Sequence, residues 1–405
     1  MTNRNTQITS GQTKPKTRIN KKRREKTQSP RDIIRFIGEV DRPFLILLII
    51  LVCFGSVMIF SASYAYAMTW FKDSYYFARK QLGWIIGGML ILAITAKVGD
   101  YRLVRKFTIP FFIVAIFFNL LLIFTSKFSL EAGGAERQLV LGPINFQPSE
   151  LLKLGVILLI SWYVTVNQAR MKTFKYGVLP FGILVIMIVG IMTMQKHLSG
   201  MIIICILIFV MMFIGGTNKF WLIVTLVVGA GGATILANVF EHAKIRLMVW
   251  QDPFAYMFTE GGKGWQPAQS LYAITSGGFW GVGLGRSNQK HNFLPEPQND
   301  YIFAIICEEL GFIGAVIIII LFALLIWRGF VIAKKAPSRF ASLMVMGLTI
   351  NVAIHVILNI AVVTNTIPST GITLPFFSYG GTSLWILLFE MGLILSVSRY
   401  SYLSK

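Results

Sequence analysis

The segment HNFLPEPQNDYIFA, at residues 291–304, places one aspartate, Asp300, directly before a long apolar run. A carboxylate that is partly removed from water can have a raised pKa and then accept a proton from a hydroxyl group. Asp300 is therefore a candidate general base. The same position also suits a helix N-cap, because Asn and Asp side chains bind the free amides of a first helical turn. Both interpretations stay open, and the two roles can coexist.

Two charged residues at the start of another apolar run are spaced for contact with each other. Glu150 and Lys153 occur in QPSELLKLG, and their i, i+3 spacing places them on one face of a helix. Because pairing lowers the cost of burying both charges, we expect a structural ion pair near the membrane interface. Other ionisable groups within apolar runs are either functional groups or polar contacts between helices. They are Glu308, Glu309, His355 and Glu390.

Cations also occur in the segments that connect the apolar runs. A cluster of them could bind phosphate through its charge and through paired guanidinium contacts, whereas a single one is more typical of a solvated loop. The candidates are Lys72, Arg137, Lys263, Arg286 and Lys290.

Cysteine and histidine give no sign of a metal centre or of a disulfide framework. The three cysteines lie in or beside apolar runs. The four histidines are scattered, without the Cys/His spacing of a zinc site. We therefore expect neither zinc nor a set of structural disulfides.

The elements that must position these residues are membrane helices. The 405-residue chain is 55% hydrophobic and only 14% charged, which is typical of a membrane protein with several spans. Its apolar runs predict an all-α polytopic membrane protein with about ten transmembrane helices. The predicted spans are 44–62, 82–98, 107–125, 150–167, 177–194, 200–215, 220–240, 301–327, 340–363 and 381–397.

The net charge of +21 predicts the orientation of these spans. Residues 1–42 hold twelve Lys and Arg against four Asp and Glu, and the connections on the same side hold fourteen against one. These connections are 97–106, 170–175, position 219, 328–339 and the C-terminal tail. The remaining twelve cations and twelve acids cancel, so the whole excess lies on one face. The positive-inside rule makes that face cytoplasmic and places both termini inside the cell.

Three regions follow from this topology. Residues 1–42 are expected to form a disordered basic cytoplasmic tail. The tail would contact anionic lipid and not nucleic acid, because the membrane already explains its charge. Residues 43–399 form the membrane domain, and residues 400–405 a short cytoplasmic C-terminus. Segment 241–300, between spans seven and eight, is a large extracytoplasmic loop.

The composition of this loop predicts folded structure over a polar cavity and not a flexible linker. Glycines recur every few residues with apolar residues between them, and irregular backbone at membrane depth is tolerated only when it is buried or lines a cavity. We expect a short interfacial helix at QPAQSLYAI and a compact re-entrant or buried turn at SGGFWGVGLG.

Four stretches together resemble the SEDS (shape, elongation, division and sporulation) family, the FtsW/RodA/SpoVE group. They are RQLVLGPINFQPSELLKL, IRLMVWQDP, the run from GWQPAQSLYAI to IICEELGFIG, and IPSTGITLPFFSYGGTSL. The resemblance covers nearly everything from about residue 42 onward. The SAS that ends the first span is more similar to the division and sporulation members than to the elongation members.

This resemblance implies a ten-span peptidoglycan glycosyltransferase that polymerises lipid II, a disaccharide-pentapeptide on undecaprenyl pyrophosphate, outside the cytoplasmic membrane. It also implies a class B penicillin-binding protein, a transpeptidase, and other division proteins as partners. The family's essential acid corresponds to Asp300, and its glutamate–lysine pair to Glu150 and Lys153. Expected contacts with the lipid II pyrophosphate and the rest of the substrate are Arg137, Arg246, Lys263, Gln269, Ser270, Lys290 and Ser378.

The chemistry expected of such a site is an inverting sugar transfer. Asp300 would deprotonate the acceptor hydroxyl, and cations or a divalent metal, Mg²⁺ or Mn²⁺, would stabilise the leaving pyrophosphate. No organic cofactor is expected. A second carboxylate is unnecessary, because pyrophosphate leaves without protonation; Glu296 is a weaker candidate for an assisting group.

Two departures from the family pattern concern local substrate contacts. Gln138 stands where the family usually has Trp, and KHLSG at 196–200 replaces the family's PDxG.

Two other functions compete with the glycosyltransferase function. A lipid II flippase would also need many spans and internal charges, but we find no internal pseudo-symmetry. A scaffold that only recruits division proteins would not need Asp300.

Overall fold

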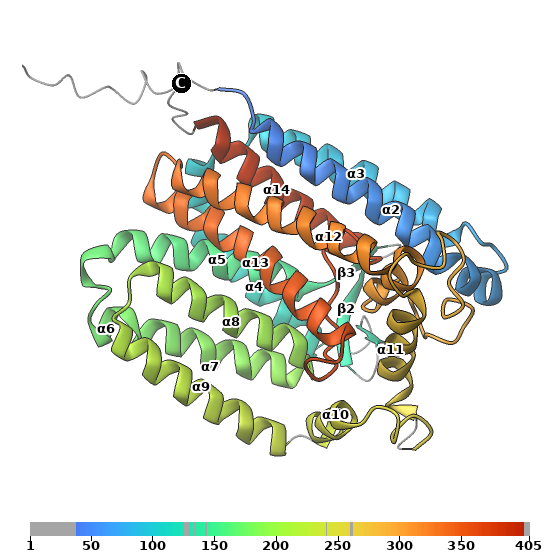
Figure 1. Cartoon of the computed structure of the whole chain (residues 1–405). Coiled ribbons are helices and arrows are strands. Elements are labelled where there is room, and N and C mark those ends of the chain that lie inside the picture. Colours follow the sequence, from blue (N-terminus) through green and yellow to red (C-terminus); the bar gives the residue numbers. More distant parts are fainter. Residues whose placement is uncertain are drawn as a thin grey trace, which may run out of the picture. The chain divides into compact units, whose positions relative to one another are not determined.

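The computed structural model describes residues 38–124, 129–132, 135–141, 144–239, 241–259 and 262–400. For some of these residues, Arg137 among them, only the backbone is described. The compact unit begins at Gly38, and the part of it that is described is mainly helical (Figure 1). Residues 1–37 of the predicted tail and residues 401–405 of the predicted C-terminus lie outside the described residues.

Within the described ranges, nine helical segments are long and apolar enough to cross a membrane. They are α2 (Arg42–Phe71), α3 (Tyr76–Val98), α4 (Tyr101–Phe124), α5 (Pro148–Val166), α6 with α7 (Phe174–Met194), α8 (Leu198–Gly215), α12 (Ile302–Lys334), α13 (Arg339–Val363) and α14 (Gly381–Tyr400). Each overlaps a predicted span, and the all-α polytopic membrane fold is confirmed. The predicted seventh span corresponds to α9 (Lys219–Val239), whose apolar stretch Lys219–Gly232 is shorter than the other nine.

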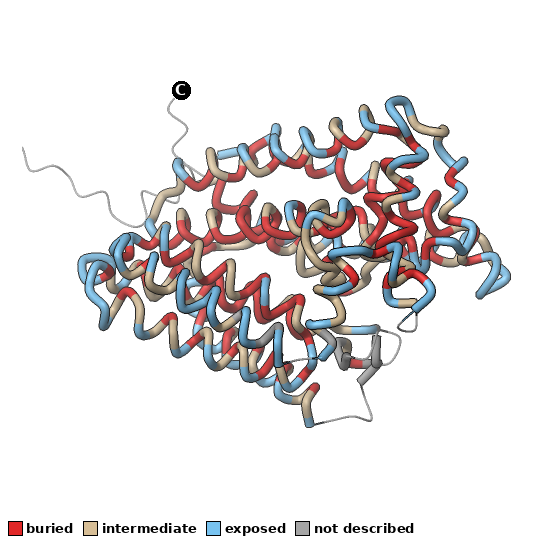
Figure 2. The backbone as a smooth tube through the Cα atoms, turned by 60° about the horizontal axis from the view of Figure 1, so that its bottom comes forward, coloured by how far each residue is buried: buried red, intermediate tan, exposed pale blue. Residues whose placement is uncertain are grey.

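The helices differ strongly in how far they are buried. Helices α5, α13 and α14 are the most enclosed, whereas less than a third of the residues in the apolar stretches of α3 and α4 are buried. Figure 2 shows buried residues gathered along the inner helices and exposed residues on the outer ones. Apolar side chains such as Ile86 and Phe117 are more than half exposed, as expected for helices that face lipid. The polar residues of the inner helices are thereby shielded from lipid.

A small antiparallel sheet precedes α5 and was not predicted from the sequence. Its strands are β1 (Ser129–Ala132), β2 (Ala135–Leu141) and β3 (Ile144–Phe146), in the order β1-β2-β3. The Gly-Pro dipeptide at 142–143, between β2 and β3, is a turn signal that could have indicated a hairpin. The Thr382 hydroxyl at the start of α14 donates to the Asn145 carbonyl at 2.8 Å, so β3 is fixed against the bundle.

The long loop between α9 and α12 is folded, as predicted. It contains α10 (Glu241–Gln251) and α11 (Trp265–Gly277), and α11 includes the predicted helix at QPAQSLYAI. The predicted compact turn follows α11 directly, but it is not buried, because Phe279, Trp280 and Leu284 are more than half exposed. It packs against an interruption in α12, where Gly311 has φ 66° and ψ −168°.

The turn replaces the backbone hydrogen bonds that this interruption removes from α12. The amides of Val282 and Gly283 donate to the carbonyls of Glu308 and Glu309 at 2.9 and 3.0 Å. In return, the Phe312 amide donates to the Gly278 carbonyl at 3.0 Å. Unpaired backbone groups are costly inside a membrane protein, so the turn and the broken helix stabilise each other.

This docking predicts a difference between two glycine substitutions in the same turn. Gly278 and Gly281 both have positive φ, but a Cβ at Gly278 would meet no atom within 4 Å, whereas at Gly281 it would lie 2.3 Å from the Glu309 carbonyl oxygen. Gly278→Ala should cost about 1–3 kcal/mol, because its backbone, with φ 53° and ψ −144°, lies in a region that residues with a side chain rarely adopt. Gly281→Ala should cost at least about 1 kcal/mol more, because hydrogen bonds to α12 are lost. Thermal unfolding in detergent, followed by helical circular dichroism, measures both; equal losses would contradict this account.

The opposite end of the bundle is closed by a polar clasp, which we define as Asp41, Arg328, Ser398 and Arg399. Asp41 caps α2 by accepting from the Phe44 amide at 3.0 Å, and it binds the Arg328 guanidinium through both carboxylate oxygens at 2.8–3.1 Å. Its own amide donates to the Ser398 hydroxyl at 3.0 Å. The Arg399 side chain donates to the Ala96 carbonyl at 3.0 Å. The clasp therefore joins the ends of α2, α3, α12 and α14.

Candidate functional site

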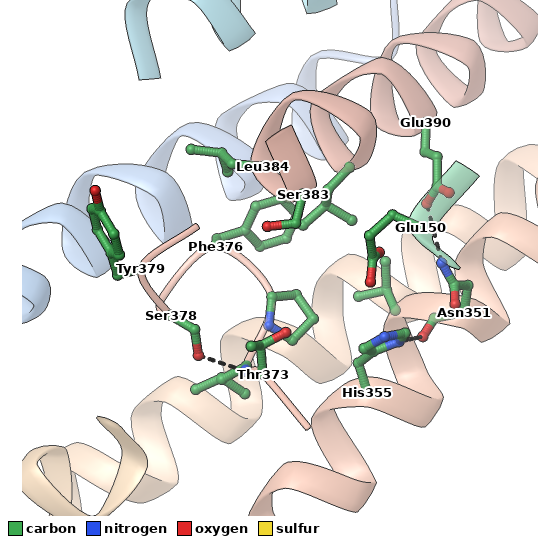
Figure 3. Close-up of a pocket in the computed structure, with 14 residues that line it drawn as sticks. Glu150, Asn351, His355, Thr373, Phe376, Ser378, Tyr379, Ser383, Leu384 and Glu390 are labelled. Atoms are coloured by element: carbon green, nitrogen blue, oxygen red, sulfur yellow. Dashed lines mark hydrogen bonds between the residues drawn. The ribbon is translucent and has the colours of Figure 1, made fainter. Parts of the chain in front are cut away.

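A polar cavity of about 40 Å³ lies between α5, α13, α14 and the loop that connects the last two helices (Figure 3). This volume has room for a few water molecules. Glu150 and Glu390 reach the cavity from α5 and α14. Thr373, Ser378 and Tyr379 line it from the 364–380 loop. Ser378, a predicted substrate contact, is therefore at the cavity, and its hydroxyl accepts from the Leu374 amide at 2.7 Å.

A buried charged network forms one side of this cavity. The Lys153 ammonium donates to Glu150 Oε1 at 2.7 Å, so the predicted ion pair is present. The same ammonium lies 2.7 Å from His355 Nε2 on α13. One turn before His355 on α13, the Asn351 amide group donates to Glu390 Oε2 at 3.2 Å. The network thus links α5, α13 and α14 through side chains that the sequence placed in three separate spans.

Asp300 lies at the junction of the outer loop, α12 and α13. It immediately precedes Tyr301, which is the N-cap of α12 and forms no side-chain capping hydrogen bond. The prediction of Asp300 as the N-cap was therefore wrong by one residue, because the helix begins later than the apolar run suggested. The Asn359 side chain donates to the carbonyls of Asp300 and Ile372, each at 2.7 Å. Asp300 is half-buried and is fixed beside the loop that lines the cavity.

Among the described residues, Arg246 on α10 is a cation that interacts with Asp300. Its guanidinium interacts electrostatically with the Asp300 carboxylate and donates to the Ser369 carbonyl at 3.2 Å. Burial lowers the pKa of Arg246, while the nearby Asp300 and Tyr301 side chains oppose this shift. Trp250, one turn later, donates to the Asn365 carbonyl at 3.0 Å. Helix α10 is thereby held against the 364–380 loop with its arginine at the candidate base.

Lys290 has surroundings different from those expected of a substrate contact. Its side chain is fully buried, and its ammonium donates to Glu309 Oε1 at 2.7 Å and to the Ser61 hydroxyl at 3.4 Å. The ring of Tyr64 lies 5.0 Å from the same ammonium. The expected phosphate-binding cation is therefore paired with a carboxylate. The sequence did not reveal this pair, because Lys290 belongs to the loop before α12 and Glu309 to α12 itself. Glu309 thus has an ion-pair partner, and Glu308 accepts from the Asn288 amide at 2.9 Å.

The remaining predicted contacts are distributed over the outer loop. Lys263 is exposed, and Gln269 is buried on α11. Ser270 is also buried, and its hydroxyl donates to the Val363 carbonyl at 2.8 Å, so it joins α11 to α13 and has no exposed surface for a substrate. Arg137 lies in β2, and its side chain is outside the described residues. Within the described residues, no three His, Cys, Asp or Glu side chains are close enough to hold a metal ion.

Sequence reasoning named His355 but missed the polar stripe on α13 to which it belongs. Asn351, His355 and Asn359 are spaced four residues apart, which places them on one helix face, and all three are buried. Asn351 and His355 line the cavity, and Asn359 fixes the backbone of Asp300. The spacing of three polar residues within an otherwise apolar span was the signal that could have found them.

Comparison with known proteins decides the family. The FtsW/RodA/SpoVE family, described as cell cycle proteins, matches residues 41–403. The chain belongs to this family. Stage V sporulation protein E of Bacillus subtilis (strain 168) is 37% identical over 368 residues, covering 89% of this chain and 97% of that protein. The probable peptidoglycan glycosyltransferase FtsW of Trichlorobacter lovleyi is 33% identical over 366 residues, covering 89% and 94%.

Two solved structures have folds similar to that of this FtsW/RodA/SpoVE protein. A chain from a peptidoglycan synthase complex that coordinates polymerization and crosslinking matches with a TM-score of 0.73 at 24% identity, covering 90% of this chain and 99% of that one. The rod shape determining protein RodA of Thermus thermophilus matches with a TM-score of 0.65 at 23% identity, covering 90% and 98%. At these identities the likeness concerns the fold alone.

Proposed function

We propose that this family member is a peptidoglycan glycosyltransferase that polymerises lipid II into β-1,4-linked glycan strands. The class of reaction rests on the close match to relatives that are named as probable peptidoglycan glycosyltransferases, over nearly their whole length. The mechanism rests on one structural observation, the half-buried Asp300 beside Arg246 at the edge of the cavity-lining loop. A carboxylate and a guanidinium that interact electrostatically supply a proton acceptor and a stabiliser of phosphate charge in the same region.

In the proposed reaction, Asp300 accepts the proton of the C4 hydroxyl on the acceptor GlcNAc. The oxygen then forms a bond to C1 of the donor MurNAc from the face opposite the pyrophosphate. The bond between C1 and the pyrophosphate oxygen breaks, and its electron pair leaves with undecaprenyl pyrophosphate. Arg246, held by Ser369, stabilises the negative charge that develops on this leaving group. The attack inverts C1 and gives the β linkage.

Among the described residues, we find no cluster of side-chain ligands for the expected divalent cation. Three or more clustered His, Cys, Asp or Glu side chains do not occur there. No step of the mechanism above is therefore assigned to Mg²⁺ or Mn²⁺. A requirement for either ion stays a prediction that polymerisation assays with and without a chelator would test.

The proposed orientation places Asp300 outside the cell and the polar clasp inside it. The cationic residues at the ends of α3, α12 and α14, among them Lys97, Lys334 and Arg399, would then face the cytoplasm, in accordance with the positive-inside rule. Both termini would be cytoplasmic. The partners proposed with this orientation are a class B penicillin-binding protein, other division proteins and membrane lipid.

Purified protein with lipid II in detergent tests the function directly. The enzyme should form glycan polymer without any membrane to cross, because the reaction needs only the substrate and the site. A flippase would leave lipid II unpolymerised in detergent and would move it across the bilayer of a vesicle. A scaffold would do neither. Assays with and without a co-purified transpeptidase would show whether polymerisation needs the partner; absence of polymer in both would overturn the proposal.

A further inference from the structure

His355 connects the charged network to the backbone of α13 in a way that determines its protonation. Its Nε2 lies 2.7 Å from the Lys153 ammonium, and its Nδ1 lies 2.7 Å from the Asn351 carbonyl oxygen. A lysine ammonium can only donate hydrogen bonds, and a carbonyl can only accept them. Nε2 must therefore accept, and Nδ1 must carry the proton. Only the neutral imidazole with its proton on Nδ1 satisfies both contacts.

The Lys153 ammonium is held between two acceptors on different helices. Glu150 Oε1 on α5 and His355 Nε2 on α13 each lie 2.7 Å from it. The Lys153 side chain is 3% exposed, whereas that of Glu150 is 19% exposed and lines the cavity. Because the ammonium binds one carboxylate oxygen, its position determines where the Glu150 carboxylate lies at the cavity. Figure 3 shows Glu150 and His355 reaching the same side of the cavity.

Of the charged groups around His355, the Lys153 ammonium favours the neutral imidazole, whereas the Glu150 carboxylate opposes it. Lys153 and Glu150 face it from α5, and Glu390 on α14 interacts electrostatically with both of these residues. His197, the N-cap of α8, interacts with Glu150 in the same way. A proton on Nε2 would remove the acceptor of Lys153 and place a second cation against its ammonium. The contacts with Lys153 therefore require an uncharged hydrogen-bond acceptor at position 355.

We propose that His355 is a positioning residue for the polymerisation reaction. It acts through Lys153, whose ammonium it fixes between α5 and α13, and so sets the place of the Glu150 carboxylate at the cavity. This inference rests on the proposed glycosyltransferase function. It assigns His355 a role beyond a polar contact between helices, because the role requires an acceptor that is aimed at Lys153.

The tautomer is tested without any activity measurement. Purified protein with ¹⁵N-labelled histidine, in lipid, should show His355 with one protonated ring nitrogen, Nδ1, and one unprotonated nitrogen, Nε2. The resonances are assigned by their loss in His355→Gln. A doubly protonated ring, or a proton on Nε2, would overturn the inference.

The role in the reaction is tested with two variants and lipid II as substrate. His355→Phe keeps a ring of similar size but has no acceptor for Lys153, and we expect kcat to fall by about tenfold or more because Glu150 is displaced at the cavity. His355→Gln can accept from Lys153 through its side-chain oxygen, so its kcat should stay within about threefold of the wild type. The KM for lipid II should change little in both, because the substrate contacts are kept.

A double-mutant cycle separates positioning from a general loss of structure. If His355 acts through Lys153, His355→Phe should have little further effect on kcat in a Lys153→Met background. Additive losses, or wild-type kcat in His355→Phe, would overturn the inference. If His355→Phe folds poorly, the inference remains testable, because His355→Gln and the histidine spectrum are independent of that variant. A wild-type protein that makes no polymer would instead contradict the proposed function and leave the tautomer to be judged by its spectrum.

Discussion

Asp300→Asn is expected to abolish polymerisation of lipid II by the purified protein. Asparagine keeps the size of the side chain but cannot accept a proton from the attacking hydroxyl. General-base catalysis commonly contributes about 10²–10⁴-fold, so kcat should fall by at least about 10²-fold. The backbone contact to Asn359 uses the carbonyl of residue 300 and is kept, so the protein should remain folded. Glycan chains separated by gel electrophoresis measure the loss.

A nearby acid provides the matched control for this variant. Glu296 lies four residues before Asp300 in the same loop, is exposed, and accepts from the Asn299 side chain at 2.7 Å. Glu296→Gln keeps this contact and should leave the rate within about twofold, because solvent-exposed substitutions away from a site have small effects. Full activity in Asp300→Asn would remove the base assignment. A loss in Glu296→Gln as large as that in Asp300→Asn would point to the charge of the loop and not to one base.

Lys290→Met is expected to destabilise the protein by about 3–5 kcal/mol, because it leaves the buried Glu309 carboxylate without its cation. Both side chains are fully buried, and the pair joins the turn at 287–290 to α12. The carboxylate would keep the Ser61 hydroxyl as a donor, at 2.6–2.8 Å, but it would lose its positive partner. Unfolding by heat or denaturant in detergent, followed by circular dichroism, measures the change.

The double variant Lys290→Met, Glu309→Gln distinguishes the ion pair from a substrate contact. Removing both charges leaves no uncompensated carboxylate, so stability should recover by about half or more of the loss. If Lys290 instead binds the lipid II pyrophosphate, Lys290→Met would have nearly wild-type stability and a strongly raised KM. That outcome would contradict the buried ion pair and restore the sequence-based assignment.

The spans were predictable because each is a long apolar run, and length and hydropathy suffice to recognise a membrane helix. The runs did not reveal where helices continue through polar ends. Helix α2 extends to Phe71 and α12 to Lys334, beyond the predicted limits. The break at Gly311 was also hidden, because it depends on the turn that supplies the missing hydrogen bonds from another part of the sequence. Local composition carries no information about such a partner.

The candidate site was predictable where it depends on neighbours in the sequence. Glu150 and Lys153 are three residues apart on one helix, so their pairing follows from helical spacing. The partner of Lys290 was not predictable, because it is set by how the loop folds back onto α12. The contact between Lys153 and His355 joins residues that are 202 positions apart and depends on how α5 packs against α13. Side-chain contacts of this kind require the packed structure.

The polar clasp limits how the bundle can rearrange during a reaction. Asp41 and Arg328 tie the start of α2 to the last turns of α12, and Ser398 adds the end of α14. The loop that contains Asp300 and the cavity-lining loop precede the other ends of α12 and α14. Helices that are joined at one end separate most at the other. If a bulky lipid-linked sugar enters between them, the helices must move apart at the Asp300 end and pivot about the end that the clasp fixes.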